Sequence, residues 1–271
     1  MARAPTSRVA RTATISAVTS QAADQSDPDL AIDGQNTVYV VWTDQRNGQP
    51  DIFGAASSSG TWANVPVVVA GGSQSDPALA ASPVSAGLHL LWVDNASGDR
   101  DVCYTRLSGL PANPVTGVSI VDDTSGAAQA TPAIVCSDDA TAFACWQDAR
   151  HAGRDGMDTD LYFAQLSATG ATTNVLVGDD GTGAGQSMPA IGLDHYDQPY
   201  IVWTDGRSRT GEIFYAATTF IDPDPLDSRL VLAAEGAVVG VDPAAIDAAG
   251  DVSIVVPAGA CQTDVRVTIS K

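Results

Sequence analysis

Trp42-Thr43-Asp44-Gln45-Arg46-Asn47-Gly48 leads into Asp51-Ile52-Phe53, and this phrase returns three more times along the chain. The later copies start at Trp92, Trp146 and Trp203. Runs of branched and aromatic residues flank each copy, and no segment shows a sustained helical period. A repeat of about 50 residues made of strand-like segments predicts similar units that bury their apolar faces against one another.

A second phrase precedes each copy and sets the period. It ends in a proline, and successive prolines lie 49, 55, 57 and 54 residues apart. These prolines are Pro28, Pro77, Pro132, Pro189 and, in a worn fifth copy, Pro243. In the first unit, the alternation of β-forming runs with turn residues predicts strands at residues 29–32, 38–42, 51–55 and 65–69. Four strands per unit indicate an all-β fold, a five-bladed β-propeller with four antiparallel strands in each blade.

The two ends of the chain supply the blade count. We predict a single domain over residues 1–271. Its blades span residues 25–70, 74–122, 129–179, 186–235 and, as the last, 242–271 together with 10–19. The last repeat has only three strands, and residues 11–18 supply a fourth. Such a closure pairs both termini and removes an open sheet edge. Six blades in a longer parent protein are the competing possibility.

The charge balance excludes some functions. Thirteen Lys and Arg against 32 Asp and Glu give a net charge of −19. Nucleic acids and anionic membrane surfaces select basic patches, so neither is an expected partner. No apolar run approaches the roughly 18 residues of a membrane span, and residues 1–11 lack the apolar segment of a secretory signal. All but two of the acidic residues are Asp, which suits turns and also oxygen-ligand cation sites.

The four cysteines are predicted to be free thiols. No Cys-x-x-Cys motif occurs. Cys136 and Cys145 fall on neighbouring strands of one hairpin, where Cys136 should face Ala142. Cys145 is then about three residues out of register, too far for a disulfide.

Both repeated phrases are predicted to meet on one face of the ring. The loop between strands two and three and the loop between blades share that face. A residue that recurs in every blade usually serves the blade, so each Trp should pack between sheets. Asp44 with Arg46, and Asp205 with Arg207, should clamp their loops through charge-assisted hydrogen bonds. A ring of ligand-facing residues remains the alternative.

The clearest break in the repeat lies in the third blade. From the Trp to the acidic start of strand three there are fourteen residues, against nine in blades one, two and four. The insertion carries His151, Arg154, Asp155 and Asp158, and Asp160 follows it. Asp155, Asp158 and Asp160 could wrap a hard cation, so calcium is the candidate cofactor. A solvated, turn-rich insertion is the favoured interpretation, because the run differs from an EF-hand loop.

The repeated phrase resembles the repeats of sialidase-like and TolB-like propellers. Ser57-Ser58-Ser59-Gly60-Thr61-Trp62 looks like a decayed Asp-box, the turn of sialidase-type blades. The resemblance implies an extracellular or surface-exposed propeller. It does not carry over sialidase catalysis, because the arginines sit in the repeat, and neither Glu212 nor Glu235 occupies a promising position.

These observations favour a non-catalytic recognition module over an enzyme. The acidic face would bind a glycan or a cell-surface protein. The candidate ligand-binding residues are Trp62, His151, Arg154, Asp155, Asp44, Arg46, Asp205 and Arg207; no catalytic residue is predicted. One alternative is a structural component of a surface or particle assembly, as a homo-oligomer. The other is a five-bladed glycoside hydrolase with carboxylates in the central channel, although no pair stands out from the repeat.

Overall fold

The computed structural model divides the chain into two compact units, Met1–Thr218 and Thr219–Lys271. The described residues are 15–84, 87–115, 119–121, 126–137, 141–151, 159–167, 170–171, 174–177, 183–194, 197–207, 211–217, 227–231, 237–240, 253–256 and 265–269. Within them the protein is all-β, and every strand pairing is antiparallel. None of these residues forms a helix that is long and apolar enough to cross a membrane.

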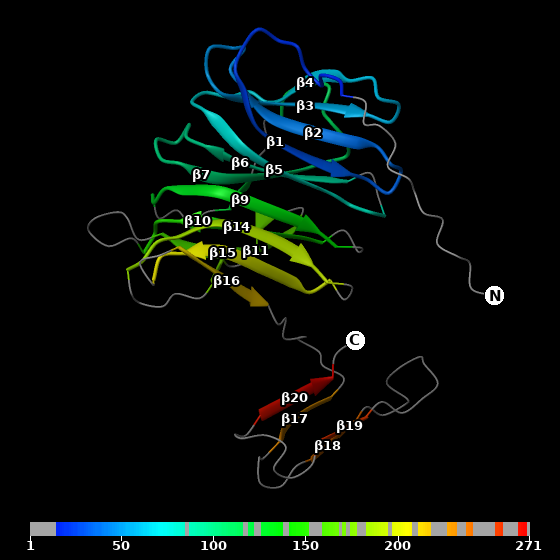
Figure 1. Ribbon diagram of the computed structural model, residues 1–271, viewed down its shortest axis with the longest axis vertical. Coiled ribbons are helices and arrows are strands. Elements are labelled where there is room, and N and C mark those ends of the chain that lie inside the picture. The colour runs from blue at the N-terminus through cyan, green and yellow to red at the C-terminus, as the bar shows by residue number, and fades with distance from the viewer. Residues whose placement is uncertain are drawn as a thin grey trace, which may run out of the picture. The chain divides into compact units, whose positions relative to one another are not determined.

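The first unit contains four sheets, which we number as blades one to four (Figure 1). Blade one comprises β1 (Gln25–Ile32), β2 (Val38–Asp44), β3 (Asp51–Ser57) and β4 (Ala63–Val68). Blade two comprises β5 (Gln74–Ala81), β6 (Leu88–Asp94), β7 (Asp101–Leu107) and β8 (Ser119–Ile120). Blade three comprises β9 (Gln129–Cys136), β10 (Ala142–Asp148), β11 (Asp160–Ser167), β12 (Gly170–Ala171) and β13 (Val175–Leu176). Blade four comprises β14 (Gln186–Leu193), β15 (Pro199–Asp205) and β16 (Glu212–Ala217).

Among its described residues, the second unit contains two two-stranded sheets. In one, β17 (Asp227–Val231) pairs with β20 (Val265–Ile269). In the other, β18 (Ala237–Gly240) pairs with β19 (Ser253–Val256).

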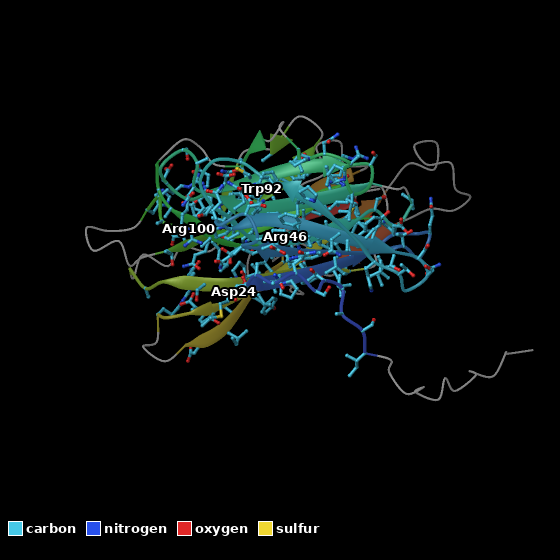
Figure 2. All side chains as sticks on the ribbon, turned by 90° about the horizontal axis from the view of Figure 1, so that it is seen from above. Asp24, Arg46, Trp92 and Arg100 are labelled. Carbon is cyan, nitrogen blue, oxygen red and sulfur yellow. The ribbon has the colours of Figure 1, made fainter. Side chains whose placement is uncertain are left out.

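The core of the first unit lies between its sheets. Figure 2 draws the side chains of the described residues, with Trp92 labelled. Strand alternation sends every second residue to each face. Trp92 thus packs in the cluster shared with blade one, Trp146 in the cluster shared with blade two, and Trp203 in the cluster shared with blade three. The predicted packing of these tryptophans between sheets is confirmed.

The hairpin register of the cysteines is also as predicted. Cys136 pairs with Ala142 across β9 and β10, whereas Cys145 pairs with Ala133. Neither cysteine forms a disulfide, nor does Cys103, as predicted, while Cys261 lies outside the described residues.

The predicted closing strand differs from the structure. Residues 15–24 form no strand, and residues 10–14 lie outside the described residues. Instead, the Asn64 side chain donates to the Val18 carbonyl over 2.9 Å, and Val18 packs on the cluster of Trp42 and Phe53. The apolar side chain of Val18 thus covers one face of blade one. None of the described sheets of the first unit packs on that face.

The predicted fourth strand of blade four differs as well. β17, expected beside β16, pairs with β20. Pro223 and Pro225 separate β16 from β17 in the sequence. Five closed blades are therefore not seen among the described residues.

Candidate active site

The innermost strand of every blade contains the same left-handed bulge. The residue before each repeat proline has a positive φ: 50° at Asp27, 50° at Asp76, 46° at Thr131 and 53° at Met188. The strand register shifts at each of these positions. Asp tolerates this conformation, whereas for β-branched Thr131 it is costly. A bulge kept in four blades despite that cost re-aims a side chain in each of them.

The four bulges line one cavity of about 480 Å³, which we call the channel cavity. Its lining residues are Asp27, Pro28, Asp29, Asp76, Pro77, Ala78, Thr131, Pro132, Ala133, Ile134, Met188, Pro189, Ala190 and Ile191. This volume lies within the range of small-molecule sites. All of the formal charge in the lining comes from three carboxylates on blades one and two.

Asp29 fixes β1 against β5. Its Oδ2 accepts a hydrogen bond from the Leu79 backbone amide over 2.7 Å, and its Oδ1 accepts from the Leu30 amide over 2.8 Å. Both carboxylate oxygens therefore bond to backbone, and we assign Asp29 a positioning role between the two strands.

Asp27 and Asp76 hold equivalent places on those two strands. Asp27 Oδ2 accepts from the Ser26 hydroxyl over 2.8 Å, and Asp76 Oδ2 accepts from the Ser75 hydroxyl over 2.9 Å. Arg100 Nη2 also donates to Asp76 Oδ2 over 3.2 Å. Asp27 and Asp76 thus line the cavity from equivalent bulges with the same backbone conformation. Arg100 holds the carboxylate of Asp76.

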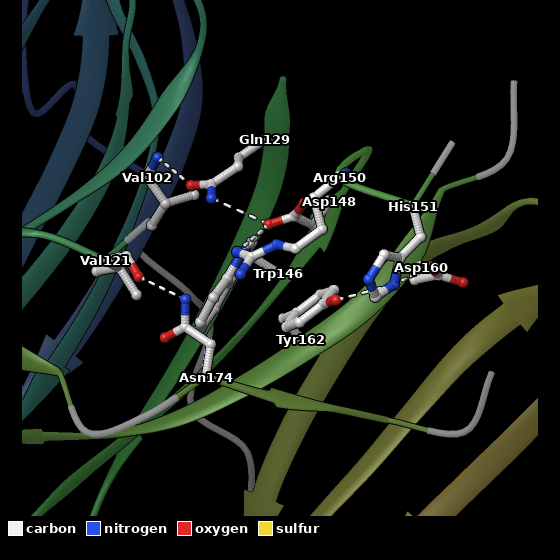
Figure 3. Close-up of polar contacts among 10 residues, drawn as sticks. All are labelled: Val102, Val121, Gln129, Trp146, Asp148, Arg150, His151, Asp160, Tyr162 and Asn174. Atoms are coloured by element: carbon white, nitrogen blue, oxygen red, sulfur yellow. Dashed lines mark hydrogen bonds and ion pairs between the residues drawn. The ribbon is translucent and has the colours of Figure 1, made fainter. Parts of the chain in front are cut away.

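In blade three, one network of hydrogen bonds surrounds the repeated Trp-x-Asp-x-Arg phrase (Figure 3). Asp148 Oδ2 accepts from Trp146 Nε1 over 3.0 Å, from Gln129 Nε2 over 3.0 Å and from Arg150 Nη2 over 2.6 Å. The Gln129 Oε1 atom accepts from the Val102 amide of blade two over 2.7 Å. Both repeated phrases therefore meet at one buried carboxylate, and they link neighbouring blades.

The predicted ligand-binding pairs of blades one and four form the same clamp. Arg46 donates to Asp44, and Arg207 donates to Asp205, in each case through both the side chain and the backbone amide. Each guanidinium lies about 4 Å above the ring of the next strand, Phe53 or Phe214. The Arg207 hydrogen bond lowers the pKa of Asp205 to about 2 against the effect of burial. These contacts favour the loop-clamp interpretation over a ring of ligand-facing residues.

The His151 side chain joins the blade-three clamp from the start of the insertion. Its Nδ1 lies 3.1 Å from the Tyr162 hydroxyl and 3.5 Å from Asp160 Oδ2 (Figure 3). Arg154, Asp155 and Asp158 lie outside the described residues. Within the described residues, no three His, Cys, Asp or Glu side chains gather as a metal site would require. The calcium site therefore stays a prediction.

Trp62 lies apart from the channel cavity. It packs against the cluster of Trp42 and Phe53, beside Val18. Together with residues 16–21, Gly60, Thr61 and Asn64 it lines a second cavity of about 560 Å³. The Ser57 hydroxyl accepts a hydrogen bond from the Gly60 amide over 2.7 Å. This bond stabilises the turn that resembles an Asp-box.

Our sequence reasoning missed the channel carboxylates Asp27 and Asp76. In the sequence, the phrase that ends in each repeat proline was used only to define the repeat period. It keeps its Gln and Pro in four copies, while the residue before the Pro changes from Asp27 and Asp76 to Thr131 and Met188. A variable position inside a constant phrase is the signal that could have found them.

Comparison with known proteins identifies the fold. No protein-family model and no curated protein matches the chain. The structure is similar to the Penicillium chrysogenum α-L-arabinanase complexed with arabinobiose, with TM-score 0.53 and 11% identity over 80% of this chain and 74% of that one. It is also similar to an endo-arabinase from Bacteroides thetaiotaomicron (TM-score 0.48, 16% identity, 72% and 75% covered). A subtype N10 neuraminidase-like protein from a little yellow-shouldered bat virus aligns with TM-score 0.46 and 9% identity over 87% and 82%.

These neighbours correct the functional expectation. They include a neuraminidase-like fold, as the repeated phrase suggested, and the Penicillium chrysogenum α-L-arabinanase, which favours the enzymatic alternative over the recognition module. The prediction of a non-catalytic recognition module, with enzymatic activity disfavoured, was wrong. Asp27 and Asp76 line one cavity through backbone bulges that the sequence does not reveal.

Proposed function

We propose that this protein is a glycoside hydrolase whose active site is the channel cavity. The observation that carries the proposal is the pair Asp27 and Asp76, which matching bulges on adjacent strands present to one cavity. Most glycoside hydrolases act through two carboxyl groups beside the scissile bond. The bond from the anomeric carbon to the leaving oxygen breaks, water supplies the new oxygen on carbon, and the leaving group departs with a proton.

The contacts around the pair support this assignment. Catalytic groups need fixed positions, because a small misplacement costs a large part of the rate. The Asp29–Leu79 hydrogen bond ties β1 to β5 and so sets the spacing of Asp27 and Asp76. Arg100 restrains the Asp76 side chain further. The clamp aspartates Asp44, Asp148 and Asp205 are unsuited to the role, because each is buried and bonded within its own blade.

The fold likeness supports a pentofuranose substrate. The Penicillium chrysogenum protein is an α-L-arabinanase, and its structure contains arabinobiose. A cavity of about 480 Å³ is large enough for one or two sugar units. We therefore expect cleavage of α-L-arabinofuranosides and of short arabino-oligosaccharides.

The test compares the variants Asp27→Asn and Asp76→Asn with the wild type on aryl α-L-arabinofuranosides and arabinobiose. Each variant should lower kcat/KM at least about a hundredfold, since acid–base groups contribute at that scale. Asp24→Asn is the matched control, because Asp24 is exposed, lies three residues from Asp27 and does not line the cavity. No hydrolysis of furanosides or pyranosides by the wild type would refute the function. Full activity in both variants would refute the site.

We also propose that the ring has five blades, with residues 242–271 and 10–19 in the last one. Exposed apolar residues on the outer sheets of the first unit support this. On blade four, Ile213 is 74% exposed and Tyr215 is 73% exposed; on blade one, Leu30 is 57% exposed and Ile32 is 54% exposed. Residues of this kind on a sheet face are typically covered by a further sheet.

Thermal and denaturant unfolding of the full chain would test the blade count. If a further sheet covers blade four, Ile213→Asp should cost about 1–3 kcal/mol, because a charge would be buried. Val84→Asp is the control, since Val84 is 68% exposed and lies in a hairpin. Equal, small effects of the two variants would count against five closed blades.

A further inference from the structure

The channel cavity has two chemically different walls. The wall of blades one and two carries Asp27, Asp29 and Asp76. The wall of blades three and four has no charged residue, and the bulge positions that hold Asp27 and Asp76 in the first two blades hold Thr131 and Met188 there. One wall is therefore anionic, and the opposite one is open to apolar contact.

Several side chains make the second wall apolar. Met188 is 71% exposed, although it is a large apolar residue in a strained left-handed conformation. Ile134 and Ile191 line the same side of the cavity. The Thr131 hydroxyl donates a hydrogen bond to Gln147 Oε1 of the same blade over 3.3 Å. Its hydrogen therefore points to blade three and not to a ligand in the cavity. A flexible methionine beside branched residues is well suited to accommodate a flat apolar group.

We propose that the β9–β14 wall binds an apolar aglycone, so that the preferred substrates are glycosides of phenolic or other apolar alcohols rather than oligosaccharides. The inference rests on the proposed function for its catalytic part. The sugar ring would lie against Asp27 and Asp76, where its hydroxyl groups find acceptors. The aglycone would lie against Met188, Ile134 and Ile191, where contact removes apolar surface from water.

The strained backbone offers clean variants for the test. Met188→Asp and Thr131→Asp introduce the residue that blades one and two carry at the same left-handed position. Asp tolerates a positive φ better than Met or Thr does, so both variants should fold at least as stably as the wild type. Met188→Leu is the matched control, because it keeps an apolar side chain of similar size.

The experiment measures binding of two non-hydrolysable ligands to the wild-type protein by calorimetry. These are phenyl and methyl 1-thio-α-L-arabinofuranoside, which differ only in the aglycone. The wild type should bind the phenyl compound about tenfold more tightly, from burial of one aromatic ring. Met188→Asp should reduce this preference to about threefold or less, while Met188→Leu should retain it.

The outcomes separate the inference from the proposed function. Equal affinity for the two ligands, no binding of either, or a preference unchanged in Met188→Asp would each overturn the apolar-wall inference. Hydrolysis of arabinobiose without a phenyl preference would leave the proposed function standing while the inference falls. A phenyl preference that depends on Met188 in a protein without hydrolytic activity would support the apolar wall and refute the hydrolase.

Discussion

Blades two and three end their second strand with the same Trp-x-Asp phrase, but different partners hold the carboxylate in the two blades. In blade three, Asp148 is buried and bonds to the side chains of Trp146, Gln129 and Arg150. Arg150 in turn lies 4.0 Å above the Tyr162 ring. Indole, amide, guanidinium and ring thus form one connected group.

Blade two has lost most of that group. Asp94 is partly exposed and accepts from Trp92 Nε1 over 3.2 Å and from the Ala96 amide over 2.8 Å. Ala96 stands where the arginine would be, and Cys103 stands where the ring would be. The Gln74 amide donates to the Gly71 carbonyl, not to Asp94. Cation and ring are absent together, which indicates that the ring is the support of the guanidinium.

The largest effect should come from removing the carboxylate. Asp148→Ala leaves the guanidinium, indole and amide donors of blade three without their acceptor in the interior, at a cost of about 3–5 kcal/mol. Asp94→Ala removes an acceptor that has no cation beside it and should cost about 1–2 kcal/mol. Denaturant unfolding of the two variants measures the difference. Equal costs would show that the clamp is no stronger in blade three than in blade two.

The next effect belongs to blade two and depends on pH. His89 is buried and lies 2.8 Å from the Tyr104 hydroxyl, at the place where blade three has Phe143. Burial, with a smaller effect of Arg106, lowers the pKa of His89 to about 4 from its ordinary 6.5. The unfolded chain therefore takes up a proton between pH 6.5 and pH 4 that the folded chain refuses.

Stability should consequently be complete above pH 6.5 and fall as the pH decreases toward 4. The loss is about 3 kcal/mol, since each pKa unit corresponds to about 1.4 kcal/mol. His89→Phe, which installs the blade-three residue, should flatten this part of the profile. The pKa of Asp205 is lowered from 3.8 to about 2, so its contribution to stability is lost mainly below pH 4, outside this window. An unchanged slope between pH 6.5 and pH 4 in His89→Phe would assign the acid sensitivity to other groups.

A smaller effect should follow removal of the ring. Tyr162→Leu withdraws the support of the Arg150 guanidinium and should cost about 1–2 kcal/mol. Tyr162→Phe keeps the ring and removes the hydroxyl that contacts His151, so its cost should stay below about 1 kcal/mol. Chemical unfolding of both variants separates the two contributions. If Tyr162→Phe cost as much as Tyr162→Leu, the His151 contact and not the ring would stabilise this blade.

The sequence predicts the strands well where hydrophobic pattern decides them. The strand expected at residues 38–42 is β2, and that expected at 51–55 is β3. The strand expected at 29–32 begins earlier, because β1 already includes Gln25 and Pro28. Asp and Pro are poor strand formers, so propensity places the phrase in a loop. The bulge that accommodates them follows from sheet geometry.

The candidate site was harder to predict for the same reason. Asp27 and Asp76 are 49 residues apart and converge only because β1 and β5 pack side by side and share the bulge. No local sequence pattern predicts that Asp27 and Asp76 lie in the same cavity. Recurrence of Asp44 and Arg46, in contrast, marked a structural clamp correctly, since a group needed in every blade is visible from the repeat alone.

The smallest effect should come from rebuilding the clamp in blade two. Ala96→Arg by itself adds a cation next to a partly exposed carboxylate and should change stability by no more than about 0.5 kcal/mol. Cys103→Phe places a ring on β7 at some packing cost. In a double-mutant cycle the two changes should couple favourably by about 0.5–1 kcal/mol, because the ring supports the guanidinium. Zero coupling would mean that the joint absence of cation and ring in blade two is coincidental.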